Sequence, residues 1–137
     1  MDSENQTAIE YPSLTRRFQS LFIDQVFIVL CMVTISQILA NIDTESTSGL
    51  RGFLFFALFF VYEPFCIAFG CSVGNFITGI RVRQFRDPEK RITIFNAYMR
   101  FGVKILLGII AFFTVTSNTS KRAMHDMAAG SVMVYNN

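Results

Sequence analysis

The chain has 137 residues, of which 52% are hydrophobic and 16% charged, and its mean hydropathy is +0.43. So apolar a chain of this size cannot bury its hydrophobic surface in a water-soluble core, and its net charge of +2 is too small to indicate a nucleic-acid-binding protein. We therefore expect an all-α membrane protein with about three transmembrane or membrane-embedded helices and the lipid bilayer as its partner. Residues 1–13 form a polar N-terminal tail, and residues 14–137 form a single membrane domain.

Two long apolar runs follow the polar tail. The first predicts a helix over about 18–40, which at 1.5 Å per residue is long enough to cross a bilayer once. After a polar loop over 41–52, a phenylalanine-rich run containing Glu63 and Pro64 predicts a second membrane helix over about 53–69.

A basic segment separates the second apolar run from the third. Residues 79–83 and 91–95 are rich in β-branched side chains, and the Asp87-Pro88 turn between them predicts a small β-hairpin over about 79–95. Residues 81–104 contain seven basic and two acidic residues, a net charge of +5. By the positive-inside rule this region is cytoplasmic.

The third apolar run, within a helix expected over about 96–116, is only marginally long enough for a crossing. It fits either a third crossing, which we favour, or a tilted or re-entrant helix. Residues 131–135 predict a short strand that resembles residues 79–83 in character. If those two strands pair, the third run returns to the side from which it started.

Charged residues stand inside these apolar runs. Arg17 and Asp24 are seven residues apart, so both lie on nearly the same face of one helix. A carboxylate at the centre of a membrane helix costs about 2.5–3.5 kcal/mol, and such residues usually face protein or water.

Asp24 and Glu63 are each seven residues from the inner end of their helix, which places them at similar depth. If the helices touch there, the two carboxylates form a candidate site for a proton or a small cation. The alternative is that Asp24 pairs with an arginine, namely Arg17, Arg100 or Arg122, and only fixes helix register.

The single histidine, His125, precedes Asp126. The chain lacks the ligands of a metal-dependent HD hydrolase, the nucleophile elbow of a hydrolase and the Gly-Lys-Ser/Thr of a nucleotide-binding loop. We therefore expect no enzymatic activity, no metal and no cofactor. Asp126 is expected to cap a short helix or to bind an arginine of the basic hairpin.

The order and spacing of these residues resemble the RDD family of membrane proteins, named for one arginine and two aspartates. The family pattern is matched by Arg17 and Asp24, Ser72-Val73-Gly74-Asn75, Gly79-Ile80-Arg81-Val82, Arg100, Arg122, His125-Asp126 and Ala129-Gly130-Ser131-Val132. Asn75 replaces the family's usual lysine.

The resemblance implies a multi-pass protein of the inner (plasma) membrane with signature residues Arg17, Asp24 and Asp126. Arg81, Arg100, Arg122 and His125 are expected to support them. It also implies a transport role, for some members monovalent-cation/proton antiport, and a chain this small would need a homo-oligomer, most simply a dimer, to enclose a path. The alternative is a non-transporting anchor, assembly factor or partner-binding module with a basic cytoplasmic face.

Overall fold

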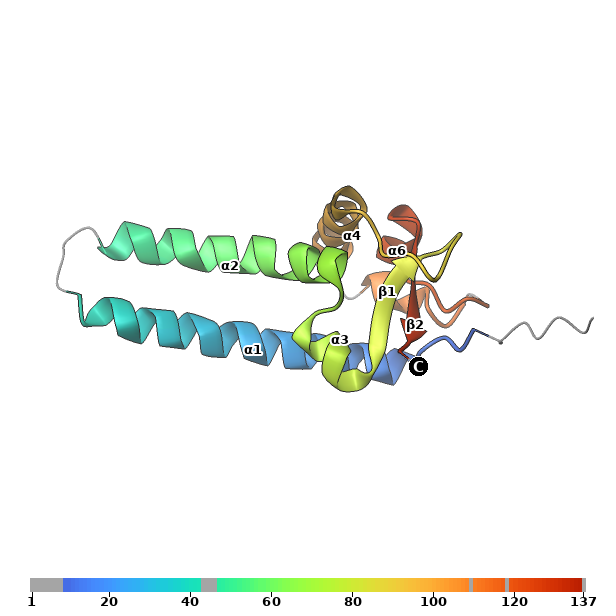
Figure 1. The fold of residues 1–137 in the computed structure, drawn as a ribbon, viewed down its shortest axis with the longest axis horizontal. Helices are drawn as coiled ribbons and strands as arrows, with labels where there is room; N and C mark the ends of the chain where they lie inside the picture. The colour runs from blue at the N-terminus through green and yellow to red at the C-terminus, as the bar shows by residue number, and fades with distance from the viewer. Residues whose placement is uncertain (1–8, 43–46, 109, 118, 137) are drawn as a thin grey trace, which may run out of the picture.

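Two long antiparallel helices dominate the computed structural model, which describes residues 9–42, 47–108, 110–117 and 119–136 (Figure 1). Helix α1 runs over Leu14–Ala40 and α2 over Thr47–Phe69. The Ser13 side chain begins α1 by accepting a hydrogen bond from the Arg16 amide. The helices predicted over 18–40 and 53–69 are confirmed, and each starts a few residues earlier than expected.

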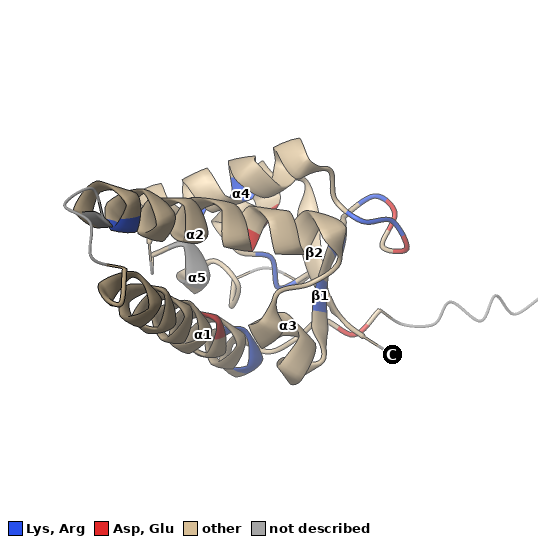
Figure 2. Cartoon of the chain, turned by 60° about the vertical axis from the view of Figure 1, so that its left-hand side comes forward, with Lys and Arg blue, Asp and Glu red and all other residues tan. Residues whose placement is uncertain are grey.

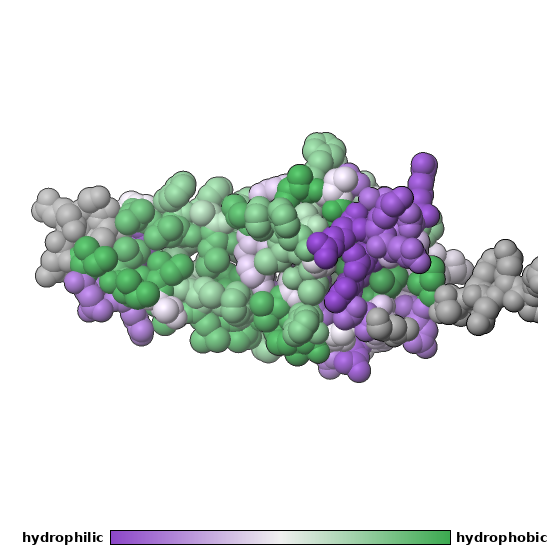
Figure 3. Space-filling view, viewed as in Figure 1, coloured by the Kyte–Doolittle hydropathy of each residue, from purple (hydrophilic) through white to green (hydrophobic). Residues whose placement is uncertain are grey.

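The paired helices expose apolar side chains along most of their length, and the space-filling view is predominantly hydrophobic there (Figure 3). Phe22, Leu30, Phe53 and Phe56 are each at least 60% exposed. Both helices are long and apolar enough to cross a membrane, and few of their residues are buried within the protein. Most charged residues instead gather at the end of the molecule that carries the sheet, away from the connection between α1 and α2 (Figure 2).

That end, which we call the base, contains a two-stranded antiparallel sheet. Strand β1, Ile80–Gln84, pairs with β2, Ser131–Tyr135, so that Ile80 faces Tyr135 and Gln84 faces Ser131. The hairpin predicted over 79–95 is therefore wrong, and the alternative pairing with residues 131–135 is the one found. The second half of the predicted hairpin instead contains the start of a helix. Thr93 accepts a hydrogen bond from the Asn96 amide and caps helix α4, Ile94–Leu107.

The third apolar segment does not continue as one helix over 96–116. Helix α4 has 14 residues, about 21 Å, and stops before Gly108, whose φ of 52° lies in the region that favours glycine. A short helix α5, Ile110–Phe113, follows, and the chain returns to the base through α6, Met124–Ala128. Because β1 precedes this segment and β2 follows it, the segment leaves the base and comes back to it. Among the described residues two helices are long and apolar enough to cross a membrane and α4 is not, and the return of the chain to the base disfavours the third full crossing that the sequence suggested.

One short helix fastens the base to α1. Helix α3, Val73–Thr78, begins where Ser72 accepts a hydrogen bond from the Asn75 amide, and it ends at Gly79 with φ 69°. Its Gly74 approaches α1 so closely that an added Cβ would stand 2.0 Å from the Ser20 carbonyl oxygen. A buried cluster of Ile67, Ile80, Val82, Ile92, Ala97 and Met133 packs the sheet against α2 and α4.

Candidate functional site

Asp126 lies between two buried arginines, and the three residues come from three different helices. Its Oδ2 is 2.8 Å from Nη1 of Arg17, and its Oδ1 is 2.7 Å from Nε of Arg100. The three side chains come from α1, α4 and α6 and are almost completely inaccessible. A carboxylate between two guanidinium groups is a charge-assisted arrangement that joins these helices at one point.

The backbone around α6 adds to this arrangement. The Ala123 amide donates to Asp126 Oδ2 at 3.3 Å, and the second guanidinium nitrogen of Arg17 donates to the Lys121 carbonyl. Arg122 donates to the carbonyls of Ser131 and Asp126 and stacks over the Phe85 ring at 3.9 Å. Asp126 therefore both caps α6 and binds arginines, although those arginines are Arg17 and Arg100 rather than residues of the basic loop.

Burial and charge set the protonation of the neighbouring groups. Burial, followed by the positive charge of Arg100, lowers the pKa of His125 to about 3. Burial alone would raise the pKa of the Asp126 carboxyl, but the surrounding charges, led by Arg100, outweigh it and hold that pKa well below its usual range. His125 Nε2 lies 3.6 Å from Asp126 Oδ1, so a neutral imidazole stands beside an ionised carboxylate near pH 7.

Glu63 belongs to an adjoining ion pair. Lys104 Nζ lies 2.5 and 2.7 Å from the two Glu63 oxygens, and Arg100 Nη1 lies 3.7 Å from one of them. Arg100 and Lys104 are four residues apart on α4 and so point from the same face. The pair joins α2 to α4 and extends the Asp126 cluster by one carboxylate and one cation.

Asp24 has a different set of partners. Its Oδ1 accepts hydrogen bonds from the Tyr62 hydroxyl at 3.0 Å and from the Gly74 amide at 2.8 Å, and its Oδ2 accepts one from the Ser72 hydroxyl at 2.6 Å. Asp24 thus ties α1 to α2 and to the start of α3. Asn75, which stands where the family has lysine, is buried and accepts a hydrogen bond from the Ser20 hydroxyl at 2.6 Å.

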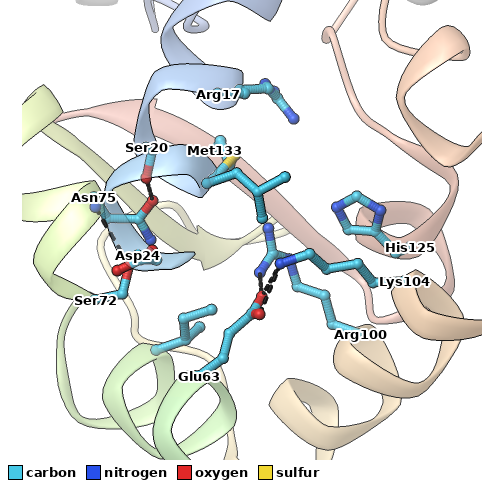
Figure 4. Close-up of a pocket in the computed structure, with 12 residues that line it drawn as sticks. Arg17, Ser20, Asp24, Glu63, Ser72, Asn75, Arg100, Lys104, His125 and Met133 are labelled. Atoms are coloured by element: carbon cyan, nitrogen blue, oxygen red, sulfur yellow. Dashed lines mark hydrogen bonds and ion pairs between the residues drawn. The ribbon is translucent and has the colours of Figure 1, made fainter. Parts of the chain in front are cut away.

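Asp24 and Glu63 line the same small cavity but bind separate partners (Figure 4). The cavity is about 20 Å³, room for roughly one water molecule, and Arg17, Arg100 and Lys104 also line it. Within the residues that the structure describes, no hydrogen bond joins the two carboxylates directly. No group of three or more His, Cys, Asp or Glu side chains that could hold a metal ion occurs there either.

The alternative prediction, that Asp24 pairs with an arginine, is wrong. Arg17 and Arg100 bind Asp126, and Arg122 binds backbone carbonyls. Arg81, on β1, forms no hydrogen bond or ion pair with this cluster among the described residues and stands opposite Val134 in the sheet. Sequence reasoning missed Lys104, Tyr62 and Ser72 as partners. The available signal for Lys104 was its place in an apolar run, four residues after Arg100.

A family model for the RDD family matches residues 11–130, which is most of the chain. The chain belongs to the RDD family. Comparison with curated proteins and with solved structures finds no match. In this RDD protein, the arginine and the second aspartate of the family pattern, Arg17 and Asp126, form one ion pair across 109 positions of sequence. The first aspartate, Asp24, stands apart with hydroxyl and amide donors.

Proposed function

We propose that the chain is a multi-pass protein of the inner (plasma) membrane in which α1 and α2 cross the bilayer and α4 and α5 belong to a re-entrant segment. Helix α4 supports this arrangement because its outward side chains are apolar: Phe95 is 71% and Leu106 85% exposed. Its inward side chains include Arg100 and Lys104. That distribution is the reverse of a water-facing amphipathic helix and suits a lipid surrounding.

In this arrangement the base lies on the cytoplasmic side. The net charge of +5 over residues 81–104 supports that orientation through the positive-inside rule. Beside these cations, Phe76 and Ile77 of α3 are 70% and 62% exposed, as expected for side chains that enter the edge of a lipid leaflet.

The function that the geometry supports best is a non-transporting membrane module that holds a basic surface against anionic lipid headgroups. The observation that carries it is that Arg17 and Asp126 are held in an ion pair and Asp24 in hydrogen bonds, all of which fix the base. The cations of β1 and of the loop after it form no ion pair with a buried carboxylate among the described residues. This basic surface comprises Arg81, Arg83, Arg86, Lys90 and Arg91, of which Lys90 pairs with the exposed Asp87 and Arg91 donates to the Phe69 carbonyl. Burial, and then the charges of Arg81 and Arg91, lower the pKa of Arg83. An anionic partner would relieve the repulsion between these like charges.

Native mass spectrometry of protein released from mixed-lipid nanodiscs tests this function. Wild-type protein is expected to retain phosphatidylglycerol in preference to phosphatidylcholine, and the Arg81→Gln/Arg83→Gln variant is expected to lose most of that preference. Arg51→Gln is the control for the loss of a positive charge outside the basic surface, because it removes one such charge near the start of α2, away from the base. An unchanged preference in the Arg81/Arg83 variant would exclude the basic surface as the lipid site.

A second candidate function is cation/proton transport. It is favoured by the shared cavity of Asp24 and Glu63, since ionisable residues at membrane depth mark ion or proton pathways by default. A homodimer would be needed to enclose a continuous path. In proteoliposomes, sodium- or potassium-dependent proton flux is expected to fall at least tenfold in Asp24→Asn. Wild-type flux equal to that of protein-free liposomes would eliminate the transport function.

A further inference from the structure

A lateral groove separates α1, α2 and α4 on the membrane side of the charged cluster. Its volume is about 360 Å³, within the size range of small-molecule sites. Most of its lining is apolar. The apolar lining comes from Leu21, Ile28, Phe59, Phe101 and Ile105.

The polar part of the groove carries no net charge. Glu63 and Lys104 line it, and their ion pair at 2.5 Å neutralises both. A charged ligand would have to compete with that pair, whereas a neutral one would not.

Gln25 provides the remaining polar group. Its side chain is exposed on α1 and lines the groove, and no described residue forms a hydrogen bond with its amide. An amide left without a partner in hydrocarbon costs free energy, so this position calls for a ligand that donates or accepts a hydrogen bond.

Depth restricts the ligand further. Gln25 lies eight residues beyond Arg17, about 12 Å along the axis of α1. If Arg17 marks the end of α1 nearest the water, as its contacts with the base indicate, Gln25 lies below the lipid phosphates. A phosphate-bearing headgroup would not reach this depth without leaving water, whereas an uncharged carbonyl or hydroxyl would.

We propose that this groove binds a neutral amphipathic lipid drawn from the bilayer. Its hydrocarbon chain lies along the apolar wall formed by α1, α2 and α4, and its carbonyl or hydroxyl group forms a hydrogen bond with the Gln25 amide. The proposal is independent of the lipid-headgroup function of the basic surface, which lies at the base.

The absence of tryptophan from the sequence gives a clean optical test. Phe59→Trp places one tryptophan in the groove, and Phe22→Trp places one on an outward position of α1 that is 70% exposed. Each variant, in nanodiscs, is titrated with a brominated long-chain alcohol, whose bromine quenches tryptophan fluorescence on contact. Saturable quenching is expected at position 59, and only a gradual, non-saturating decrease at position 22. Ile105→Trp, a second groove position, replaces Phe59→Trp if that variant does not fold.

Gln25→Leu in the Phe59→Trp background tests the polar contact. Loss of one hydrogen bond is expected to weaken the saturable phase about two- to tenfold. Gln37→Leu, the same substitution near the far end of α1, is expected to leave it unchanged.

Four results would overturn the proposal. Equal, non-saturating quenching at positions 59 and 22 would mean that the groove takes no lipid. Unchanged affinity in Gln25→Leu would rule out the hydrogen bond with the Gln25 amide. Tighter binding of a brominated carboxylate than of the alcohol would rule out a neutral ligand. Protection of position 59 that disappears when a dimer dissociates would show that a second copy fills the groove.

Discussion

Asp126 is the residue on which the base most depends, because it neutralises two buried guanidinium groups at once. Asp126→Asn leaves the buried Arg17 without a carboxylate and leaves the buried Arg100 only its 3.7 Å contact with Glu63. We expect this variant to lose about 3–5 kcal/mol of unfolding free energy, the usual consequence of breaking a buried pair on one side. Thermal unfolding in detergent, followed by circular dichroism, measures the loss.

The matched control is Asp87→Asn, which removes the same charge from a solvent-exposed pair with Lys90. Exposed pairs contribute little to stability, so this variant should unfold with the wild type. Similar unfolding of wild type and Asp126→Asn would mean that the arginines find other partners.

The lowered pKa of His125 makes the stability of the folded protein depend on pH. The pKa of His125 is about 3 in the folded protein and about 6.5 in an unfolded chain, so between these values only the unfolded state binds the proton. Unfolding free energy therefore decreases as pH falls from about 6.5 toward 3, by at most about 1.4 kcal/mol per pH unit. Because the pKa of Asp126 is also lowered, protonation of that carboxyl adds to the loss only below about pH 4.

Unfolding midpoints of the wild type and of His125→Gln between pH 4 and 8 test this dependence. The variant is expected to show a flatter profile between pH 6.5 and 4. Identical slopes in that interval would assign the pH dependence to other groups.

The sequence identified Arg17, Asp24 and Asp126 as important but could not assign their partners. Spacing along one helix places Arg17 and Asp24 on nearly the same face, about two turns apart, yet Arg17 binds a carboxylate 109 positions away. Asp24 binds hydroxyl and amide groups that carry no charge and so leave no trace in a charge pattern. Such partners are fixed by helix packing, which no local pattern contains.

At the scale of elements, the contact between α1 and α3 requires a glycine. A Cβ at Gly74 would stand 2.0 Å from the Ser20 carbonyl oxygen and 2.9 Å from the Asp24 carboxyl carbon, so the helices would have to separate. We expect Gly74→Ala to cost about 1–3 kcal/mol by overpacking and to weaken the hydrogen bond from the Gly74 amide to Asp24. The shift in unfolding midpoint measures it.

Gly70→Ala serves as the comparison, since no atom lies within 4 Å of a Cβ built there. It should unfold at the wild-type temperature or slightly above it. An equal effect of the two substitutions would argue against close packing at Gly74.

Apolar length predicted α1 and α2 well, because a run of about twenty apolar residues has few other stable forms in lipid. Composition was a poorer guide over residues 91–95, where β-branched side chains fit a strand and a helix start equally. Thr93 decided between them by capping α4, and residues 131–135 supplied the pairing strand.

For the whole molecule, the arrangement predicts which segments share one side of the membrane. With Cys31, Cys66 and Cys71 replaced by serine, single cysteines are introduced as Glu89→Cys, Asn136→Cys and Ser48→Cys. Because β1 pairs with β2, the first two should react with a membrane-impermeant maleimide from one side of sealed vesicles. Ser48→Cys, at the far end of the helical pair, should react only from the other side.

Labelling of Asn136→Cys from the same side as Ser48→Cys would instead indicate a third full crossing. Hydropathy alone left this choice open, since the run near residues 101–116 is marginal in length. The break at Gly108 and the pairing of β1 with β2 are the features that favour return to the same side.

The ion pair between Arg17 and Asp126 has a consequence for biosynthesis. Since a chain is made from its N-terminus, Arg17 is synthesised 109 positions before the carboxylate that neutralises it, and Arg100 is also made earlier than Asp126. Until α6 emerges, α1 carries an arginine whose final partner does not yet exist, and β1 has no strand to pair with. The base therefore closes as a late step, after both long helices are complete, and a nascent chain interrupted before Asp126 displays Arg17 without its carboxylate to the quality-control machinery of the cell.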